Sequence, residues 1–289
     1  MKNFSISKKF TLVSLTVTVL AILIGYFTLN YYKNQLINDV YSSIKNELSK
    51  SSIDRIKAKF DVGISNAISI ANDSMIKEAL VKNDRDLAIK ALEKLSQSMK
   101  SNTPFKNIKV HIHTKDNHSF LRSWKPNKFG DDLSSFRESV VKVNSTKKAI
   151  NTFEVGKAGL SIRSVVPIFS HSGEHIGSLE FMQGINSVAK AFDSNKEGFI
   201  LLMDKSLAVT NINSKDVLWN KYLISQKFIN NNFLEDLKSI DLNNFLSEKL
   251  YSSEKYTYTY IDIKDFENNK VGIAISAKPN SIVHLAINK

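Results

Sequence analysis

The hydrophobic pattern of the chain begins with an uncharged run from Phe10 to Tyr32, and no comparable run follows it. A helix of this length covers about 34 Å, enough to cross a hydrocarbon core of about 30 Å. Lys8 and Lys9 stand just before the run, and no acidic residue precedes it. The positive-inside rule therefore predicts a cytoplasmic segment at 1–9, a transmembrane helix at 10–32 and an exported remainder.

A cleavable signal peptide is the alternative interpretation of the same run. The apolar region of a signal peptide is usually shorter and ends in small residues at a cleavage site. This run instead ends in aromatic residues, among them Tyr31 and Tyr32, which suit a membrane interface. We therefore expect an anchor that is not removed.

The next part of the chain has helical spacing and forms a long helical region at 33–101. Between Lys33 and Ser101 there is no proline and one glycine, Gly63. The pattern predicts a long helix that continues from the anchor, followed by a second helix from Asp84 to Met99. Asn83 or Asp84 is a plausible N-cap for the second helix.

After Pro104 the pattern changes to strands joined by turns. Ile108, Val110 and Ile112 alternate with polar residues, which is typical of a strand. The segments expected in this first module are a strand around 108–113, a strand at Ser119–Trp124, a helix at Phe136–Val143, a hairpin formed by Gly159–Phe169 and His175–Gln183, and a connecting helix at Ile185–Phe192.

A second, smaller module repeats the same coarse plan. The segments expected there are strands at Gly198–Met203 and Leu207–Asn211, helices within Ser225–Leu250, and a final hairpin of Tyr256–Ile263 and Val271–Ala277. The fold class is therefore α+β with antiparallel sheets, and we place the modules at 102–192 and 193–289.

Composition removes several function classes. The net charge is +12, but the lysines are scattered and the domain is exported, so we expect a solvated basic surface and no nucleic-acid binding. There is no cysteine, which excludes disulfides and thiolate metal sites. The chain has only 10 glycines and none of the common catalytic or nucleotide-binding motifs. We expect neither an enzyme nor a bound cofactor.

The candidate binding residues cluster between Phe120 and Arg137. Arg122 and Trp124 are two apart on a strand and project to the same face, where a guanidinium fork suits a carboxylate and an indole offers a stacking surface. We expect the following loop to fold back over this face. Its candidate ligand contacts are Phe129, Asp131 and Asp132. The structural alternative is that Arg122 pairs with Asp131 or Asp132 while Trp124 fills the core.

Three further residues carry weaker signals. Arg163 lies in an apolar run and is either a site residue or an ion-pair partner. His111 and His113 share one strand face and could hold a metal. No acid stands beside them at ligand spacing, so we expect solvent-facing or hydrogen-bonded histidines and no metal site.

These residues carry a family resemblance. The segments are Phe120-Leu-Arg-Ser-Trp-Lys-Pro126, Phe129-Gly-Asp-Asp-Leu-Ser-Ser-Phe-Arg137, Glu154-Val-Gly-Lys-Ala-Gly-Leu-Ser-Ile-Arg163 and Gly177-Ser-Leu-Glu-Phe-Met-Gln-Gly184. Together they resemble the double Cache sensory domains of bacterial receptors, in the variety described as a double sensory domain of two-component sensor kinases and also found in methyl-accepting chemotaxis proteins. The resemblance spans Lys33–Lys289 in layout and is specific over Val110–Phe192.

The resemblance implies a long helix with a membrane-distal and a membrane-proximal PAS-like (Cache) module, of which the distal one holds a small ligand. Amino-acid-binding relatives use an Arg-x-Trp pair, which Arg122 and Trp124 match, followed by a tyrosine, where this chain has Lys125. The implied ligand is therefore a small organic molecule, such as a carboxylate.

The same resemblance implies a place in the cell and a partner. We expect a single-pass inner-membrane protein with a cytoplasmic N-terminus and a periplasmic sensory domain, acting as a homodimer or with a receptor. Relatives continue into a second membrane helix and a cytoplasmic output domain, which this sequence lacks. The expectation is a receptor's sensory half, and the alternative is an accessory protein that pairs with a full-length receptor or another periplasmic protein.

Overall fold

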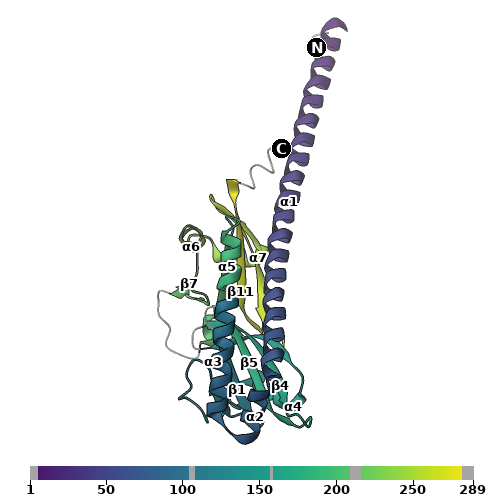
Figure 1. The fold of residues 1–289 in the computed structure, drawn as a ribbon. Coiled ribbons are helices and arrows are strands. Elements are labelled where there is room, and N and C mark those ends of the chain that lie inside the picture. The colour runs from purple at the N-terminus through teal and green to yellow at the C-terminus, as the bar shows by residue number, and fades with distance from the viewer. Residues whose placement is uncertain (1–5, 104–107, 157–158, 209–215, 282–289) are drawn as a thin grey trace.

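The computed structural model describes residues 6–103, 108–156, 159–208 and 216–281, with side chains from residue 10 onward. It begins with one continuous helix, α1 (Ile6–Ala71), which contains both the apolar run and its polar continuation. The predicted long helix that continues from the apolar run is confirmed. Figure 1 shows α1 extending well beyond the rest of the molecule at its N-terminal end.

Two turns divide the predicted helical region into three helices. Helix α1 ends at Ala71, and Asp73 caps α2 (Ser74–Lys82) by accepting hydrogen bonds from the backbone N–H groups of Met75 and Ile76. Asn83 then adopts a left-handed conformation (φ 54°) before α3 (Arg85–Asn102). Asp84, one of the two predicted candidates, is the N-cap of α3. The break at Asp73 was not predicted.

The first sheet has, among the described residues, five strands in the order β2-β1-β5-β4-β3, and all neighbouring pairs are antiparallel. Its elements are β1 (Lys109–Thr114), β2 (Ser119–Arg122), α4 (Glu138–Thr146), β3 (Ile150–Gly156), β4 (Gly159–Phe169) and β5 (His175–Gln183). The predicted hairpin of β4 and β5 is confirmed with its bounds. The predicted strand at Ser119–Trp124 is too long, because β2 ends at Arg122 and Trp124 lies in the turn that follows. Strand β3 was not predicted.

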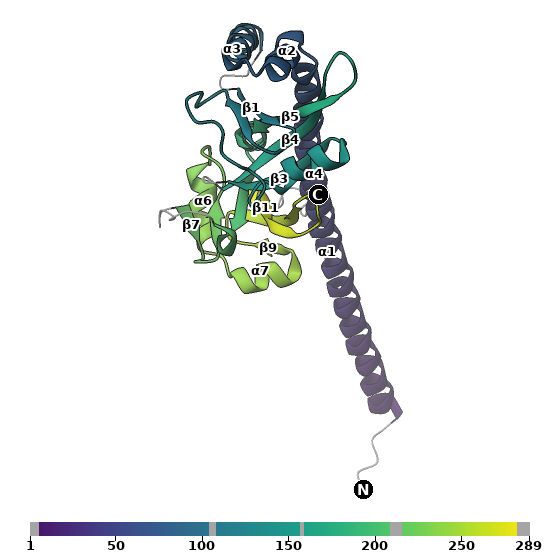
Figure 2. The same ribbon diagram turned by 90° about the horizontal axis from the view of Figure 1, so that it is seen from below.

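The two faces of this sheet differ in character. One face packs against α1, α2 and α3 through apolar side chains such as Val110, Leu179 and Phe181. The other face is covered in part by α4, where Val140 and Val143 contact Val165. Figure 2 shows α2 and α3 on one side of these strands and α4 on the other. Buried polar and charged side chains gather on this second face.

The second sheet has six strands within the described ranges, in the order β7-β8-β6-β11-β10-β9. Its elements are α5 (Asn186–Asp193), β6 (Gly198–Asp204), the 3₁₀ turn η1 (Lys205–Leu207), β7 (Val217–Leu218), β8 (Tyr222–Ile224), α6 (Asn231–Lys238), α7 (Leu242–Glu248), β9 (Leu250–Ser252), β10 (Tyr256–Lys264) and β11 (Lys270–Pro279). The final hairpin is confirmed. The predicted strand at Leu207–Asn211 is wrong at Leu207, which ends η1, and 209–211 lie outside the described residues.

Helix α1 supports both sheets along its length. Ile44, Leu48 and Ile56 belong to a core cluster that includes strands of the second sheet, whereas Ala67 and Ile70 pack under the first. The second sheet therefore lies nearer the N-terminal end of α1 (Figure 1). The apolar side chains from Phe10 to Tyr32 are exposed, and this stretch makes α1 the one described helix that is apolar and long enough to cross a membrane.

Candidate ligand-binding site

The polar face of the first sheet brings together residues from three neighbouring strands. Arg122 of β2 lies opposite His111 of β1, and His111 lies opposite Glu180 of β5. Directly paired residues project to the same side of a sheet, so these three side chains are neighbours. Arg163 of β4 reaches the same place and donates from Nη1 to Glu180 Oε1 at 2.8 Å. The predicted residues Arg122 and Arg163 therefore share one buried face.

A cluster of four charges lies at the centre of this face. Arg137, just before α4, donates to Glu180 Oε1 at 2.5 Å and to Glu154 Oε2 at 3.2 Å. Arg163 Nε lies 3.2 Å from the same Glu154 oxygen. Burial would raise the pKa of Glu180, but the two guanidiniums outweigh burial and hold that pKa well below its ordinary value. The four charges balance to zero.

The histidines beside this cluster are buried and hydrogen-bonded. His111 Nε2 lies 2.8 Å from Ser119 Oγ, and His113 Nδ1 lies 3.0 Å from Ser178 Oγ. Burial lowers the pKa of both imidazoles, which favours their neutral forms. The hydrogen-bonded alternative from the sequence is confirmed, and the solvent-facing one is wrong because β1 is an inner strand whose polar face is covered.

Arg122 holds the loop that follows β2. Its guanidinium donates to both carboxylate oxygens of Asp131 at 2.7 Å and to the Lys128 carbonyl at 2.8 Å. The Arg122 hydrogen bonds lower the pKa of Asp131. The structure thus contains the ion pair that the sequence left as an alternative. The Asp131 side chain remains 33% exposed, so this pair lies at the edge of the buried face.

Trp124 and the other predicted loop residues lie outside the core. Trp124 is 40% exposed, and its ring lies 5.8 Å from that of His111, so the suggestion that it fills the core is wrong. Asp132 is exposed and accepts a hydrogen bond from Ser134 N at 2.9 Å. Phe129 is also exposed, and the Arg85 guanidinium stacks on its ring at 3.4 Å.

Arg85 is a loop contact that the sequence did not predict. It lies at the start of α3 and donates to the Phe120 carbonyl at 3.0 Å and to the Pro126 carbonyl. The loop is therefore fastened at two points, by Arg85 from α3 and by Arg122 from β2. The sequence also did not single out Arg137, Glu154 and Glu180, which lie on the same buried face as the predicted residues Arg122 and Arg163. Glu180 carried a signal, because it is a single charge between Leu179 and Phe181.

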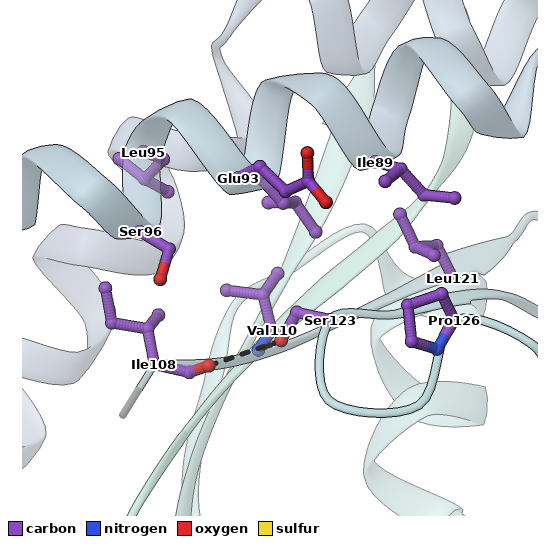
Figure 3. A pocket seen from close by; sticks show the side chains of 10 residues that line it. Ile89, Glu93, Leu95, Ser96, Ile108, Val110, Leu121, Ser123 and Pro126 are labelled. Atoms are coloured by element: carbon purple, nitrogen blue, oxygen red, sulfur yellow. Dashed lines mark hydrogen bonds between the residues drawn. The ribbon is translucent and has the colours of Figure 1, made fainter. Parts of the chain in front are cut away.

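The structure also contains two cavities away from the charged face. The first, of about 110 Å³, lies between α3 and the β1–β2 edge. Figure 3 shows its apolar lining by Ile89, Leu95, Val110 and Leu121, and the Ser123 hydroxyl that donates to the Ile108 carbonyl at 3.3 Å. The second is an open groove of about 340 Å³, where α1 meets Phe153 of β3 and the end of β10. Neither is lined by any of the six predicted site residues.

Most of the chain matches a known family of sensory domains. Residues 41–280 match the family model described as the double sensory domain of two-component sensor kinase. No curated protein matches the chain. The structure is similar to the extracellular domain of the putative histidine kinase vpHK1S-Z8, with a TM-score of 0.51 and 12% identity over 89% of this chain and 97% of that one. At this identity the likeness concerns the fold.

Two further solved structures have lower scores. The sensor domain of the histidine kinase DctB from V. cholerae has a TM-score of 0.49 and 11% identity over 83% of this chain and 98% of that one. The ligand-binding domain of the Campylobacter jejuni chemoreceptor Tlp3, in complex with 4-methylisoleucine, has a TM-score of 0.49 and 13% identity over 87% and 93%.

Proposed function

The chain belongs to the double sensory domain family of two-component sensor kinases, and from this premise we propose that it is a membrane-anchored receptor domain that binds a small carboxylate outside the cytoplasm. The family consists of sensory domains of the Cache type, which bind ligands and transmit their presence. Features of α1 and of the first sheet support the anchor, its orientation and the class of ligand.

The exposed apolar stretch of α1 supports the anchor and its orientation. Apolar side chains from Phe10 to Tyr32 face outward all around the helix, which a membrane would cover. Lys8 and Lys9 at its start favour a cytoplasmic N-terminus and a periplasmic remainder. In that orientation the first sheet, with its module at 102–192, is membrane-distal, and the module at 193–289 is membrane-proximal.

The Arg122–Asp131 pair is the observation that carries the ligand proposal. Asp131 meets the guanidinium through both oxygens, which is the geometry with which arginine binds a free carboxylate. The pair is partly exposed, and the Trp124 ring stands two residues away with an accessible surface. A small organic carboxylate would replace Asp131 on Arg122 and place its non-polar part against Trp124. The loop would then lose its Asp131 contact and keep the contact with Arg85.

The opposite side of the same sheet offers a path to α1. Gln183 of β5 donates to the Lys59 carbonyl at 2.9 Å, and Asn151 of β3 donates to the Phe60 carbonyl at 3.3 Å. A Cβ on Gly63 would lie 2.4 Å from both Gln183 Nε2 and Ser164 Oγ, so α1 and the strands are in close contact there. A ligand that binds one arrangement of the loop and sheet better than another would favour that arrangement and so shift the position of α1. In a dimer, the shift of α1 relative to its partner helix would carry the signal toward the membrane.

The test compares two neighbouring aspartates in the full-length chain in detergent. Acetate, pyruvate, succinate and L-alanine are titrated by calorimetry into the wild type, Asp131→Asn and Asp132→Asn. Asp131→Asn removes the carboxylate that competes for Arg122, so this variant should bind the ligand about two- to fivefold more tightly. This fold-change corresponds to the free energy that a partly exposed ion pair contributes. Asp132→Asn is the matched control and should bind as the wild type does.

Arg122→Lys completes the test, because it keeps the charge and removes the bidentate fork. Its affinity for the bound carboxylate should fall at least tenfold. The proposal is wrong if this variant binds as tightly as the wild type, if both aspartate variants behave alike, or if no carboxylate binds to Asp131→Asn.

A further inference from the structure

Three donor atoms on the polar face of the first sheet converge. His111, His113 and Glu180 are buried, and each offers a ligand atom that lies within 4.8 Å of the other two. His113 Nε2 and Glu180 Oε2 have no hydrogen-bond partner among the described residues, and His111 Nδ1 lies 3.7 Å from Glu180 Oε2. Unpartnered polar atoms in a protein interior are unfavourable, so their grouping at one point needs an explanation.

The opposite nitrogen of each imidazole is already held. His111 Nε2 is paired with the Ser119 hydroxyl and His113 Nδ1 with the Ser178 hydroxyl. When each of these nitrogens donates its hydrogen to the serine, the remaining nitrogen presents a lone pair toward Glu180. Histidines that bind metals are oriented in this way by a second partner.

The contacts of Glu180 leave one of its carboxylate oxygens available to a cation. Both guanidiniums, Arg137 and Arg163, contact Oε1 of Glu180, and Oε2 remains on the histidine side. Glu154 balances the second guanidinium. The rings of His111 and His113 lie 4.1 Å apart, and a bound cation would draw the three ligand atoms together from a present spread of up to 4.8 Å.

We propose that His111, His113 and Glu180 form a binding site for a divalent transition-metal cation of the zinc type. Two imidazole nitrogens and one carboxylate oxygen are a common set for zinc, with bond lengths of about 2.0–2.2 Å, and leave a fourth position open. The site does not depend on the organic ligand proposed for Arg122. It lies next to Trp124, whose ring contacts His111, so occupation should alter the fluorescence of that residue.

The experiment uses the full-length chain in detergent, stripped of metal with a chelator and equilibrated with zinc chloride. Elemental analysis should give one zinc per chain, bound at least tenfold more tightly than in His113→Gln. His171→Gln removes an exposed histidine from a turn and is the matched control. Ser178→Ala should weaken zinc binding about 10- to 100-fold, because it removes the group that orients His113.

Cobalt(II) gives a readout that does not depend on any variant folding. Bound at this site in the wild-type chain, it should show the visible absorption of a nitrogen-ligated low-coordinate ion, and one equivalent of zinc should abolish that absorption. Circular dichroism checks that His113→Gln keeps its fold. The proposal is overturned if the wild type binds less than one zinc per chain, if cobalt gives only the spectrum of the hydrated ion, or if folded His113→Gln and His171→Gln bind zinc equally.

Discussion

Replacement of Arg137 by methionine tests whether the charged cluster behaves as one unit. Arg137 contacts Glu180 and Glu154, and Glu180 has no exposed surface. Methionine fills much of the volume of the arginine stem but carries no charge. Both carboxylates then keep Arg163 as their one remaining guanidinium, and the cluster is left with an uncompensated buried negative charge.

The size of the effect follows from burial. Removing one partner of a buried ion pair destabilises proteins by about 3–5 kcal/mol. Because Arg163 still contacts both carboxylates, we expect the lower end, about 3 kcal/mol of the free energy of unfolding. With a slope of about 2 kcal/mol per molar urea, the midpoint should fall by about 1.5 M.

The assay can follow the first module alone. The chain has two tryptophans, Trp124 beside the first sheet and Trp219 beside the second. In a Trp219→Phe background, urea-induced changes in tryptophan fluorescence report on the first module only. Lys82→Met is the control, because its pair with Glu78 lies on the exposed side of α2 and should leave the midpoint nearly unchanged. Equal midpoints for Arg137→Met and Lys82→Met would refute the reasoning.

Two further predictions concern the second sheet. In Gly272→Ala the new Cβ would lie 2.0 Å from the Leu202 carbonyl oxygen, whereas a Cβ at Gly184 would meet nothing within 4 Å. Thermal unfolding should show a loss of stability of about 1–3 kcal/mol for Gly272→Ala and little change for the control Gly184→Ala. Equal stabilities of the two variants would contradict the packing argument. Burial raises the pKa of Tyr222 to about 12, whereas a tyrosine in the unfolded chain titrates near pH 10. The neutral phenol therefore contributes its full stability below pH 10, and this contribution is lost as the pH rises toward about 12. Tyr222→Phe should flatten this decline in alkaline urea titrations, and an unchanged decline would assign it to other groups.

Much of the fold was predictable because its elements have local signals. Strands β4 and β5 have the predicted bounds, since a polar turn around Gly173 separates two apolar runs. Strand β3 was missed for a physical reason. Its Thr152 and Glu154 face the charged cluster, so the strand does not show apolar alternation on that face. The break between α1 and α2 was missed because a single capping aspartate, Asp73, causes it.

The sequence predicted which types of residue form the candidate site better than it predicted which of them form ion pairs. Arg122 and Asp131 are close in sequence, and their pairing was one of two stated alternatives. Arg137 and Glu180 are 43 positions apart, so only the sheet register and the α4 connection bring them together. The convergence of His111 and His113 with Glu180 has the same origin, because the pairing of β1 with β5 supplies the acid that neighbouring sequence lacks.

The contrast between the two faces of the first sheet supports the proposal that its charges serve binding. Leu179 and Phe181 of β5 face an apolar core, whereas Ser178 and Glu180, which alternate with them, face the polar side. Replacing a whole buried ion cluster by apolar side chains is often neutral or stabilising, although removing one member is costly. Stability alone therefore does not account for Arg137, Glu154, Arg163 and Glu180. Their placement beside the Arg122–Asp131 pair supports the proposal that this face of the sheet binds a ligand.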